Sequence, residues 1–342
     1  MEKPKKIDII IPVKRINDYI YESVPIILNL KYDNYSIVIL PDEVDNEKEL
    51  SPLMEKAGST DNQSKIQIIE TGPIGPAEKR DLAIKHCDGD ILAFLDDDAY
   101  PREDWLTNAV QHFTTLKVGA VGGPAITPPH DTFWQKVSGA VFLSTLSGGN
   151  PDRYWSGNER KEVDDWPSVN LLVRKDLFRA IGGFNSKYWP GEDTKLCLDI
   201  TYFGKKIIYD PEVIVWHHRR EGLDRHLKQI AGYGLHRGFF ARVYPENSRK
   251  FKYFIPSLFV CFLFAGFIFQ FLNNPLINSI YYLGIGAYLF SLSAAFYQIY
   301  KKTESLLVST ASTGYIFLTH IWYGINFIKG FLTKKLKSKL RE

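Results

Sequence analysis

Three consecutive aspartates, Asp96, Asp97 and Asp98, come directly after the apolar run DILAFL. Adjacent carboxylates repel one another, and a divalent cation at a strand end relieves that repulsion. Mg²⁺ or Mn²⁺ would take one or two carboxylate oxygens and fill its other positions with water and substrate phosphates. The triplet therefore predicts a metal site that suits a substrate carrying a diphosphate. Taken alone, a solvated acidic turn that caps the next helix is the alternative.

Four short apolar runs could position such a site, at residues 7–13, 35–40, 65–70 and 90–96. Amphipathic segments separate them, and this alternation predicts a mostly parallel sheet with helices on both faces. Ligands of such α/β sheets bind beyond the carboxyl ends of the strands, which is where the three aspartates fall. A further acidic pair, Glu192 and Asp193, indicates by itself only the N-terminus of a helix.

Several segments in fixed order are more specific than any single motif. They are IIPVKR, ILPDE, GPAEKRDLAIKHCDGDILAFLDDDAYP and GGFNSKYWPGEDTKLCLD. In this combination the chain resembles the family 2 inverting glycosyltransferases of GT-A fold. The resemblance covers residues 7–245, about two-thirds of the chain. It implies a Rossmann-like α/β domain that binds a nucleotide diphosphate sugar.

The resemblance also implies roles on the donor side of the site. Asp42 matches the aspartate that binds the nucleotide base, although Pro41 replaces the acidic residue that often precedes it. Arg80 falls where the family has an arginine facing the donor, and Asp81 stands where asparagine is usual. Asp96 matches the residue that reaches the ribose. The predicted donor-binding residues are Pro12, Asp42, Arg80, Asp96, Asp97 and Asp98.

Glu192 and Asp193 resemble the family's ED motif, whose aspartate removes the proton of the acceptor hydroxyl. Asp193 is therefore the predicted base, with Glu192 beside it, and a positioned base contributes about 10²–10⁴ in rate. Asp98 is the predicted metal ligand, with Asp96 and His217 as further candidates. The run His217 to Arg220 could equally be a basic patch that faces lipid headgroups.

Three residues resemble the acceptor side of family members, where aromatic faces pack against sugar rings. They are Trp166, Asn170 and Trp189. Each could equally belong to the core.

Charged residues become scarce after Tyr253, and residues 254–272 contain none. Two further apolar stretches cover about 276–299 and 306–328. Their lengths predict two or three membrane helices, the alternative being buried core helices. The expected organisation is a catalytic domain at residues 1–250, a membrane region at 251–330 and a basic tail at 331–342.

Lys301 and Lys302 separate the second stretch from the third. The positive-inside rule then places residues 1–250 and this loop in the cytoplasm. The tail is basic as well, so we expect the third stretch to lie in the interface or to re-enter the membrane instead of spanning it. The short N-terminal apolar run does not have the form of a signal peptide.

The chain has 42 Lys and Arg residues against 39 acidic ones, a balance that argues against a dedicated nucleic-acid binder. Cys87, Cys197 and Cys261 are far apart, without the spacing of a zinc or redox motif, and a reducing compartment fits best.

The region between Arg220 and Tyr244 lacks the QxxRW motif of similar processive synthases, which favours transfer of one sugar per acceptor. The resemblance implies a UDP-sugar as the donor, with GDP- and dTDP-sugars as the alternatives. The apolar stretches suggest a lipid-linked acceptor of polyprenyl phosphate type, in the synthesis of cell-surface polysaccharide or glycoconjugates. A non-catalytic membrane protein that binds nucleotide sugars within a glycan assembly complex is the alternative. A sugar nucleotidyltransferase would need a glycine-rich loop after the first strand, where Pro12 and Val13 stand instead.

Overall fold

The computed structural model describes residues 4–147, 150–157, 159–272 and 274–336. They form two compact units, each made of two stretches of chain. The first takes its described residues from Met1–Ile126 and Trp155–His218, and the second from Thr127–Tyr154 and Arg219–Lys337. This division does not follow the boundary expected at residue 250, because the segment that starts at Thr127 packs with the C-terminal helices. Most of the predicted basic tail, residues 337–342, lies outside the described residues.

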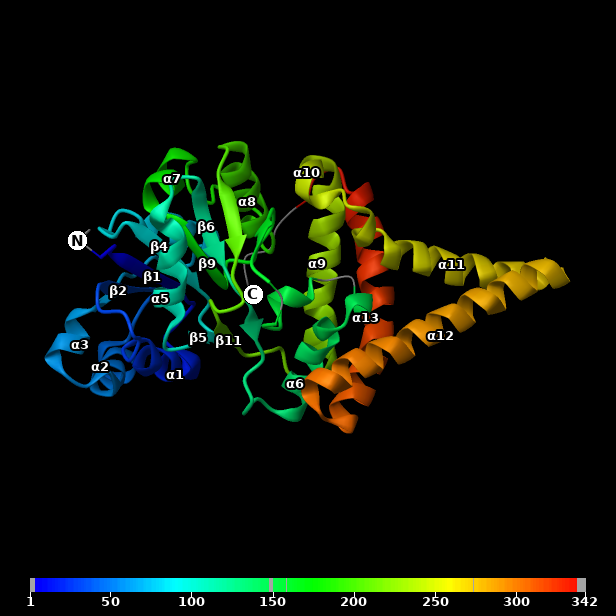
Figure 1. Ribbon diagram of the computed structural model, residues 1–342, viewed down its shortest axis with the longest axis horizontal. Coiled ribbons are helices and arrows are strands. Elements are labelled where there is room, and N and C mark those ends of the chain that lie inside the picture. Colours follow the sequence, from blue (N-terminus) through cyan, green and yellow to red (C-terminus); the bar gives the residue numbers. More distant parts are fainter. Residues whose placement is uncertain (1–3, 148–149, 158, 273, 337–342) are drawn as a thin grey trace. The chain divides into compact units, whose positions relative to one another are not determined.

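An eight-stranded sheet forms the centre of the first unit, with the strand order β3-β2-β1-β4-β9-β6-β10-β8 (Figure 1). Strands β1 to β4 are parallel, β9 runs antiparallel to β4 and β6, and β10 is again parallel to β6. The strands are β1 (Ile7–Pro12), β2 (Tyr35–Leu40), β3 (Ile66–Ile68), β4 (Ile91–Leu95), β6 (Val118–Gly122), β8 (Lys161–Val163), β9 (Asn170–Arg174) and β10 (Lys206–Tyr209). The predicted α/β class and the four predicted strands are confirmed.

The alternation of side chains along β1 builds a core on both faces of the sheet. Ile7, Ile9 and Ile11 belong to one buried cluster, whereas Ile10 belongs to the cluster on the other face. Apolar residues on both faces explain why Ile9, Ile10 and Ile11 follow one another without a polar residue between them. The helices of this unit are α1 (Asp18–Ile27), α2 (Ser51–Ala57), α3 (Thr60–Ser64), α4 (Pro76–Ala83), α5 (Trp105–Val110), α7 (Lys175–Ala180) and α8 (Glu192–Tyr202).

A second, three-stranded sheet has the order β5-β11-β7. Its strands are β5 (Ala99–Pro101), β7 (Ala125–Ile126) and β11 (Val215–His217). Strand β11 runs antiparallel to β5, and this register places His217 opposite Ala99. The pairing therefore brings a histidine from late in the chain beside the aspartates that precede β5.

The second unit consists of helices α6 (Phe133–Ala140), α9 (Leu223–Val243), α10 (Pro245–Ser248), α11 (Ile255–Phe269), α12 (Pro275–Thr303) and α13 (Leu306–Leu332). Helices α9 and α13 approach closely along glycines. A Cβ atom at Gly238 would lie 2.1 Å from the Phe327 carbonyl oxygen, and one at Gly330 would lie 1.9 Å from the Leu235 carbonyl oxygen. Larger residues at these positions would force the two helices apart.

Two helical segments are long and apolar enough to cross a membrane, Ile255–Leu272 and Pro275–Thr303. Only 17% and 6% of their most apolar windows are buried, whereas a core helix of that composition would be mostly covered. Figure 1 shows α11 and α12 extending as a pair from α9 and α13. Helix α13 is one unbroken helix, so it does not have the broken form of a re-entrant segment, and its buried residues include Ser312, Thr319 and His320.

Candidate functional site

The acidic triplet lies where β4 ends and the chain turns into β5. Its three carboxylates have different surroundings. Asp96 is partly exposed and bonded to Arg80, Asp97 accepts a hydrogen bond from the Asn17 side chain, and Asp98 is only 5% exposed. Asn17 also caps the N-terminus of α1, so Asp97 is tied to the start of that helix. The triplet is thus a shaped site and not a freely solvated turn.

His217 comes within 3.1 Å of Asp98, measured from Nε2 to Oδ1. Ligand atoms of Asp96, Asp98 and His217 all lie within 4.8 Å of one another. The β5–β11 pairing causes this approach, since it sets His217 beside the residue that follows Asp98. Two carboxylates and an imidazole at this spacing are a donor set that fits a divalent cation. The structure brings together the three predicted ligands from opposite ends of the domain.

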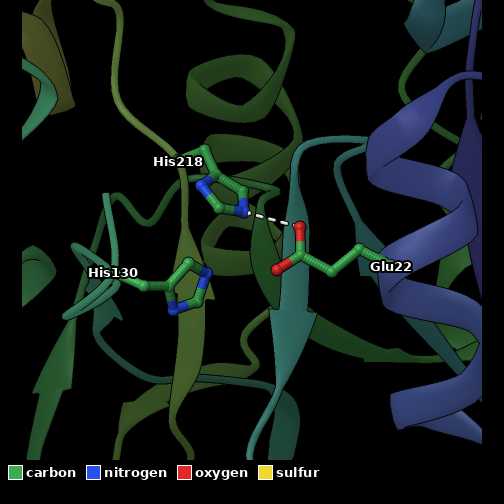
Figure 2. A group of neighbouring side chains, drawn as sticks. All are labelled: Glu22, His130 and His218. Atoms are coloured by element: carbon green, nitrogen blue, oxygen red, sulfur yellow. Dashed lines mark hydrogen bonds and ion pairs between the residues drawn. The ribbon is translucent and has the colours of Figure 1, made fainter. Parts of the chain in front are cut away.

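The neighbouring histidine, His218, points to a different partner. Figure 2 shows its hydrogen bond to Glu22 on α1, with Nε2 2.9 Å from Oε2. Its ring also stacks on Tyr19 at a centroid distance of 4.8 Å. The sequence offers two adjacent histidines, and the structure distinguishes them: His217 lies at the aspartates and His218 packs against α1.

A cleft of about 170 Å³ opens at the carboxyl ends of the parallel strands. Its walls come from the ends of β1, β2 and β4, from the loop before α4, and from the start of α8. The lining residues are Pro12, Val13, Lys14, Asp42, Pro73, Ile74, Gly75, Pro76, Lys79, Arg80, Asp96, Asp97, Trp189 and Glu192. Most predicted donor-site residues therefore share one cavity, which has the position expected of a ligand site in an α/β sheet.

Arg80 lies between two carboxylates of the cleft. Its Nη2 is 2.5 Å from Asp96 Oδ1, and its Nη1 is 3.2 Å from Glu192 Oε1. The guanidinium is 2% exposed and lies over the Phe184 ring. A permanently charged group that is this deeply buried must be paired, and it neutralises acidic residues from two distant segments. The predicted contact of Arg80 with a donor stays a prediction.

Glu192 and Asp193 form the first turn of α8, which Gly191 introduces at a φ of +110°. Only glycine adopts that backbone region readily, so it fixes the direction in which the two carboxylates enter the helix. Glu192 is buried against Arg80, while Asp193 is partly exposed and does not line the cleft itself. Burial, followed by repulsion from Asp193, raises the pKa of Glu192 to about 7.

The raised pKa of Glu192 makes stability depend on pH. Between pH 4.5 and about 7 the folded chain keeps a proton that the unfolded chain loses. We therefore expect stability to fall as pH rises through this window, by at most about 1.4 kcal/mol per pH unit from this group. Thermal unfolding of the wild type and Glu192→Gln in a metal chelator measures the difference. Parallel pH slopes for the two proteins would refute the assignment.

Two charged residues of α4 have partners that the sequence did not indicate. The Asp81 carboxylate accepts the backbone N–H groups of Phe184 and Asn185, at 2.7 and 2.9 Å. It therefore holds the loop that leads towards α8, which accounts for an acidic residue where asparagine is usual.

Lys79 is buried and bonded to Asp42 at 2.5 Å. Charged helix residues are mostly exposed, so no local pattern could have identified Lys79.

Two of the three predicted acceptor-side residues belong to the core. Trp166 and Asn170 have no exposed surface. The Trp166 indole donates to the Gly123 carbonyl oxygen at 3.0 Å, and the Asn170 amide donates to the Pro124 and Val213 carbonyl oxygens. Their prediction as acceptor contacts is wrong, because these polar groups are used to join strands and loops inside the domain. Trp189 lines the cleft beside Glu192, and its role on the acceptor side stays a prediction.

The sequence model described as "Glycosyl transferase family 2" matches residues 8–181, slightly more than half of the chain. The pre-mycofactocin glycosyltransferase of Mycobacterium tuberculosis is 30% identical over 174 residues. That alignment covers 51% of this chain and 36% of the relative, so the chain spans only about a third of the length of that protein.

A relative from Methanococcus voltae aligns over nearly its whole length. It is 23% identical over 344 residues, covering 95% of this chain and 97% of its own. Its name is dolichyl N-acetyl-alpha-D-glucosaminyl phosphate 3-beta-D-2,3-diacetamido-2,3-dideoxy-beta-D-glucuronosyltransferase. Among solved structures, the mannosyltransferase PcManGT from Pyrobaculum calidifontis, in complex with GDP-Man and Mn²⁺, superposes with a TM-score of 0.57 at 19% identity, covering 98% of this chain and 89% of that one. This likeness shows a shared fold.

Proposed function

Because the chain belongs to glycosyl transferase family 2, we propose that it transfers one sugar, with inversion, from a nucleotide diphosphate sugar to a lipid-linked acceptor. One observation carries the proposal. A single cleft at the strand ends is lined by Asp42, by Asp96 and Asp97 of the acidic triplet, and by Glu192 in the first turn of α8. These residues would bring the nucleotide, its diphosphate and the incoming hydroxyl next to one another.

The donor would lie along this cleft, with its base near Asp42 and its diphosphate near Asp96 and Asp98. Asp96, Asp98 and His217 would hold Mg²⁺ or Mn²⁺. When bound, such a cation offsets the negative charge that develops on the departing phosphate. Arg80 pairs with Asp96, so this carboxylate is positioned before any ligand arrives.

Asp193 would act as the base. As the acceptor oxygen attacks the anomeric carbon, a carbon–oxygen bond forms on one face and the bond to the diphosphate breaks on the other. The hydroxyl proton passes to the Asp193 carboxylate, and the nucleoside diphosphate leaves with the bonding electrons. Attack opposite the leaving group inverts the anomeric centre. Asp193 is the better candidate than Glu192, because Glu192 is buried and its carboxylate is already paired with Arg80.

We further propose that α11 and α12 cross a membrane as a helical pair. Their exposed apolar surfaces support this, since water would be a poor solvent for them. Lys301 and Lys302 at the end of α12 and Lys250 and Lys252 before α11 would then lie on the same side. The positive-inside rule makes that side cytoplasmic. The interfacial location of α13 stays part of this proposal.

A membrane anchor in the same chain as the catalytic site favours an acceptor delivered from the lipid. The name of the full-length M. voltae relative includes a dolichyl phosphate acceptor, which supports this class of acceptor. We propose a sugar-bearing or free polyprenyl phosphate for this chain. The glycan would then serve a cell-surface polysaccharide or glycoconjugate.

The test uses the full chain in membranes, because a cut near residue 250 would separate α9 from α13 within one unit. Radiolabelled UDP-, GDP- and dTDP-sugars are supplied with a lipid extract, with and without Mn²⁺. We expect one donor to label the lipid fraction in a metal-dependent way and to release its nucleoside diphosphate. Donor binding without release would favour the non-catalytic alternative. Equal labelling of water-soluble acceptors would contradict the lipid-linked acceptor.

A further inference from the structure

Lys79 is a buried cation whose three ammonium protons are all engaged. Its Nζ donates to the Val13 carbonyl oxygen at 2.7 Å, to the Leu40 carbonyl oxygen at 3.0 Å and to Asp42 Oδ1 at 2.5 Å. The residue is 3% exposed. With three donors and three acceptors the ammonium is fully satisfied, so it has no reason to rotate. Lys79 therefore fixes one oxygen of Asp42 to the ends of β1 and β2.

The other oxygen of Asp42 remains for a ligand. Within the described part of the chain, the Asp42 side chain bonds to Lys79 alone, through Oδ1. The backbone around it is also held, because Asp42 N–H donates to the Lys14 carbonyl oxygen and Gly72 N–H donates to the Asp42 carbonyl oxygen. Asp42 is thus a rigid acceptor with one open oxygen, at a cleft wall shared with Pro73 and Ile74.

Nucleotide bases differ in how many donors they offer to such a carboxylate. Uracil and thymine present one imide N–H between two carbonyl groups. Guanine presents a ring N–H and an amino group side by side, and these match a carboxylate with two open oxygens. Adenine and cytosine place an acceptor nitrogen beside their amino group, which an oxygen lone pair repels. Oδ1 keeps a second lone pair, but an oxygen that already accepts from a lysine ammonium is a weaker acceptor for another donor. Asp42 therefore matches the single imide N–H of uracil or thymine better than the paired donors of guanine.

We infer that Lys79 is a specificity-determining residue that makes Asp42 select uridine or thymidine nucleotides over guanosine nucleotides. The inference rests on the proposed function, because it concerns the donor base in the same cleft. Lys79 itself would act by positioning Asp42 and not by touching the base. A purely structural lysine would affect the affinities for all nucleotides equally, whereas a specificity determinant changes their ratio.

The test is calorimetric binding of UDP, dTDP and GDP to the full chain in the presence of Mn²⁺. We expect the wild type to bind UDP or dTDP about tenfold or more tightly than GDP, since guanine would leave a donor unpaired. Lys79→Met opens the second oxygen and should reduce this ratio at least about fivefold, mainly by a relative gain for GDP. Should that variant not fold, Lys79→Gln is measured in its place.

Lys175→Met is the matched control. Lys175, the first residue of α7, is also a buried lysine, and its Nζ donates to the Cys87 carbonyl oxygen. Neither residue lines the cleft. Its loss should leave the ratio unchanged. A wild type that prefers GDP, or an unaltered ratio in the Lys79 variants, would overturn the inference while leaving the proposed function standing. A chain that binds none of the nucleotides would overturn the proposed function instead.

Discussion

Replacing Asp193 with asparagine is expected to abolish sugar transfer while leaving donor binding nearly unchanged. The amide keeps the shape of the side chain but cannot accept the proton of the acceptor hydroxyl. A positioned base contributes about 10²–10⁴ in rate, so turnover should fall by that factor or more. Asp193 does not line the donor cleft, and the dissociation constant of the nucleotide should therefore stay within about twofold of the wild type. Transfer rates and calorimetric titration measure the two effects.

Asp199→Asn is the control for this experiment. Asp199 lies on the same helix and is paired with Lys195 four residues earlier, in a partly exposed pair outside the cleft. The control should retain wild-type turnover. If Asp193→Asn also retained near-normal turnover, the base would have to be another group, and Glu192 would be the next residue to replace.

Replacing Asp98 with asparagine should remove the dependence of donor binding on metal. Asp98 is buried beside His217, and the asparagine amide would offer a neutral oxygen where the cation needs a charged one. We expect Mn²⁺ to strengthen binding of the nucleoside diphosphate at least about tenfold in the wild type and little in the variant. Transfer should fall in parallel, because the developing charge on the leaving group would no longer be offset. Titrations with Mn²⁺ and with chelator give the comparison.

Asp104→Asn serves as the control here. Asp104 lies shortly after β5, the strand that follows the acidic triplet, but it pairs with Arg102 and does not line the cleft. It should keep the full metal effect. Undiminished metal-dependent binding by Asp98→Asn would mean that the cation is held elsewhere. The assignment of Asp96, Asp98 and His217 as its ligands would then be incorrect.

The sequence alone was sufficient for the parallel half of the sheet. Strands β1 to β4 are short and mainly apolar, and each needs only its own pattern and the turn residues beside it to be recognised. Since parallel strands end at one edge, a ligand site was expected there, and the resemblance to family 2 assigned Pro12, Asp42 and the acidic triplet to it. The helical stretches after Tyr253 were also predictable from a local pattern, because long segments there are almost free of charged residues.

Contacts between distant segments were decided only by the tertiary structure. Trp166 and Asn170 have the residue types of a sugar-binding wall, yet strand β9 carries Asn170 into the centre of the sheet. Which of His217 and His218 reaches Asp98 depends on the β5–β11 register. The division at Thr127 and Arg219 depends on helix packing around α9.

The sequence by itself determined which side chains are available at the strand ends, because local periodicity and chain order fix where each strand stops. It did not determine how their charges are balanced. Arg80 between Asp96 and Glu192, and Lys79 between Asp42 and two carbonyl oxygens, are pairings across the fold. Such pairings form because burial makes every unpaired charge costly, and burial exists only after the segments have packed.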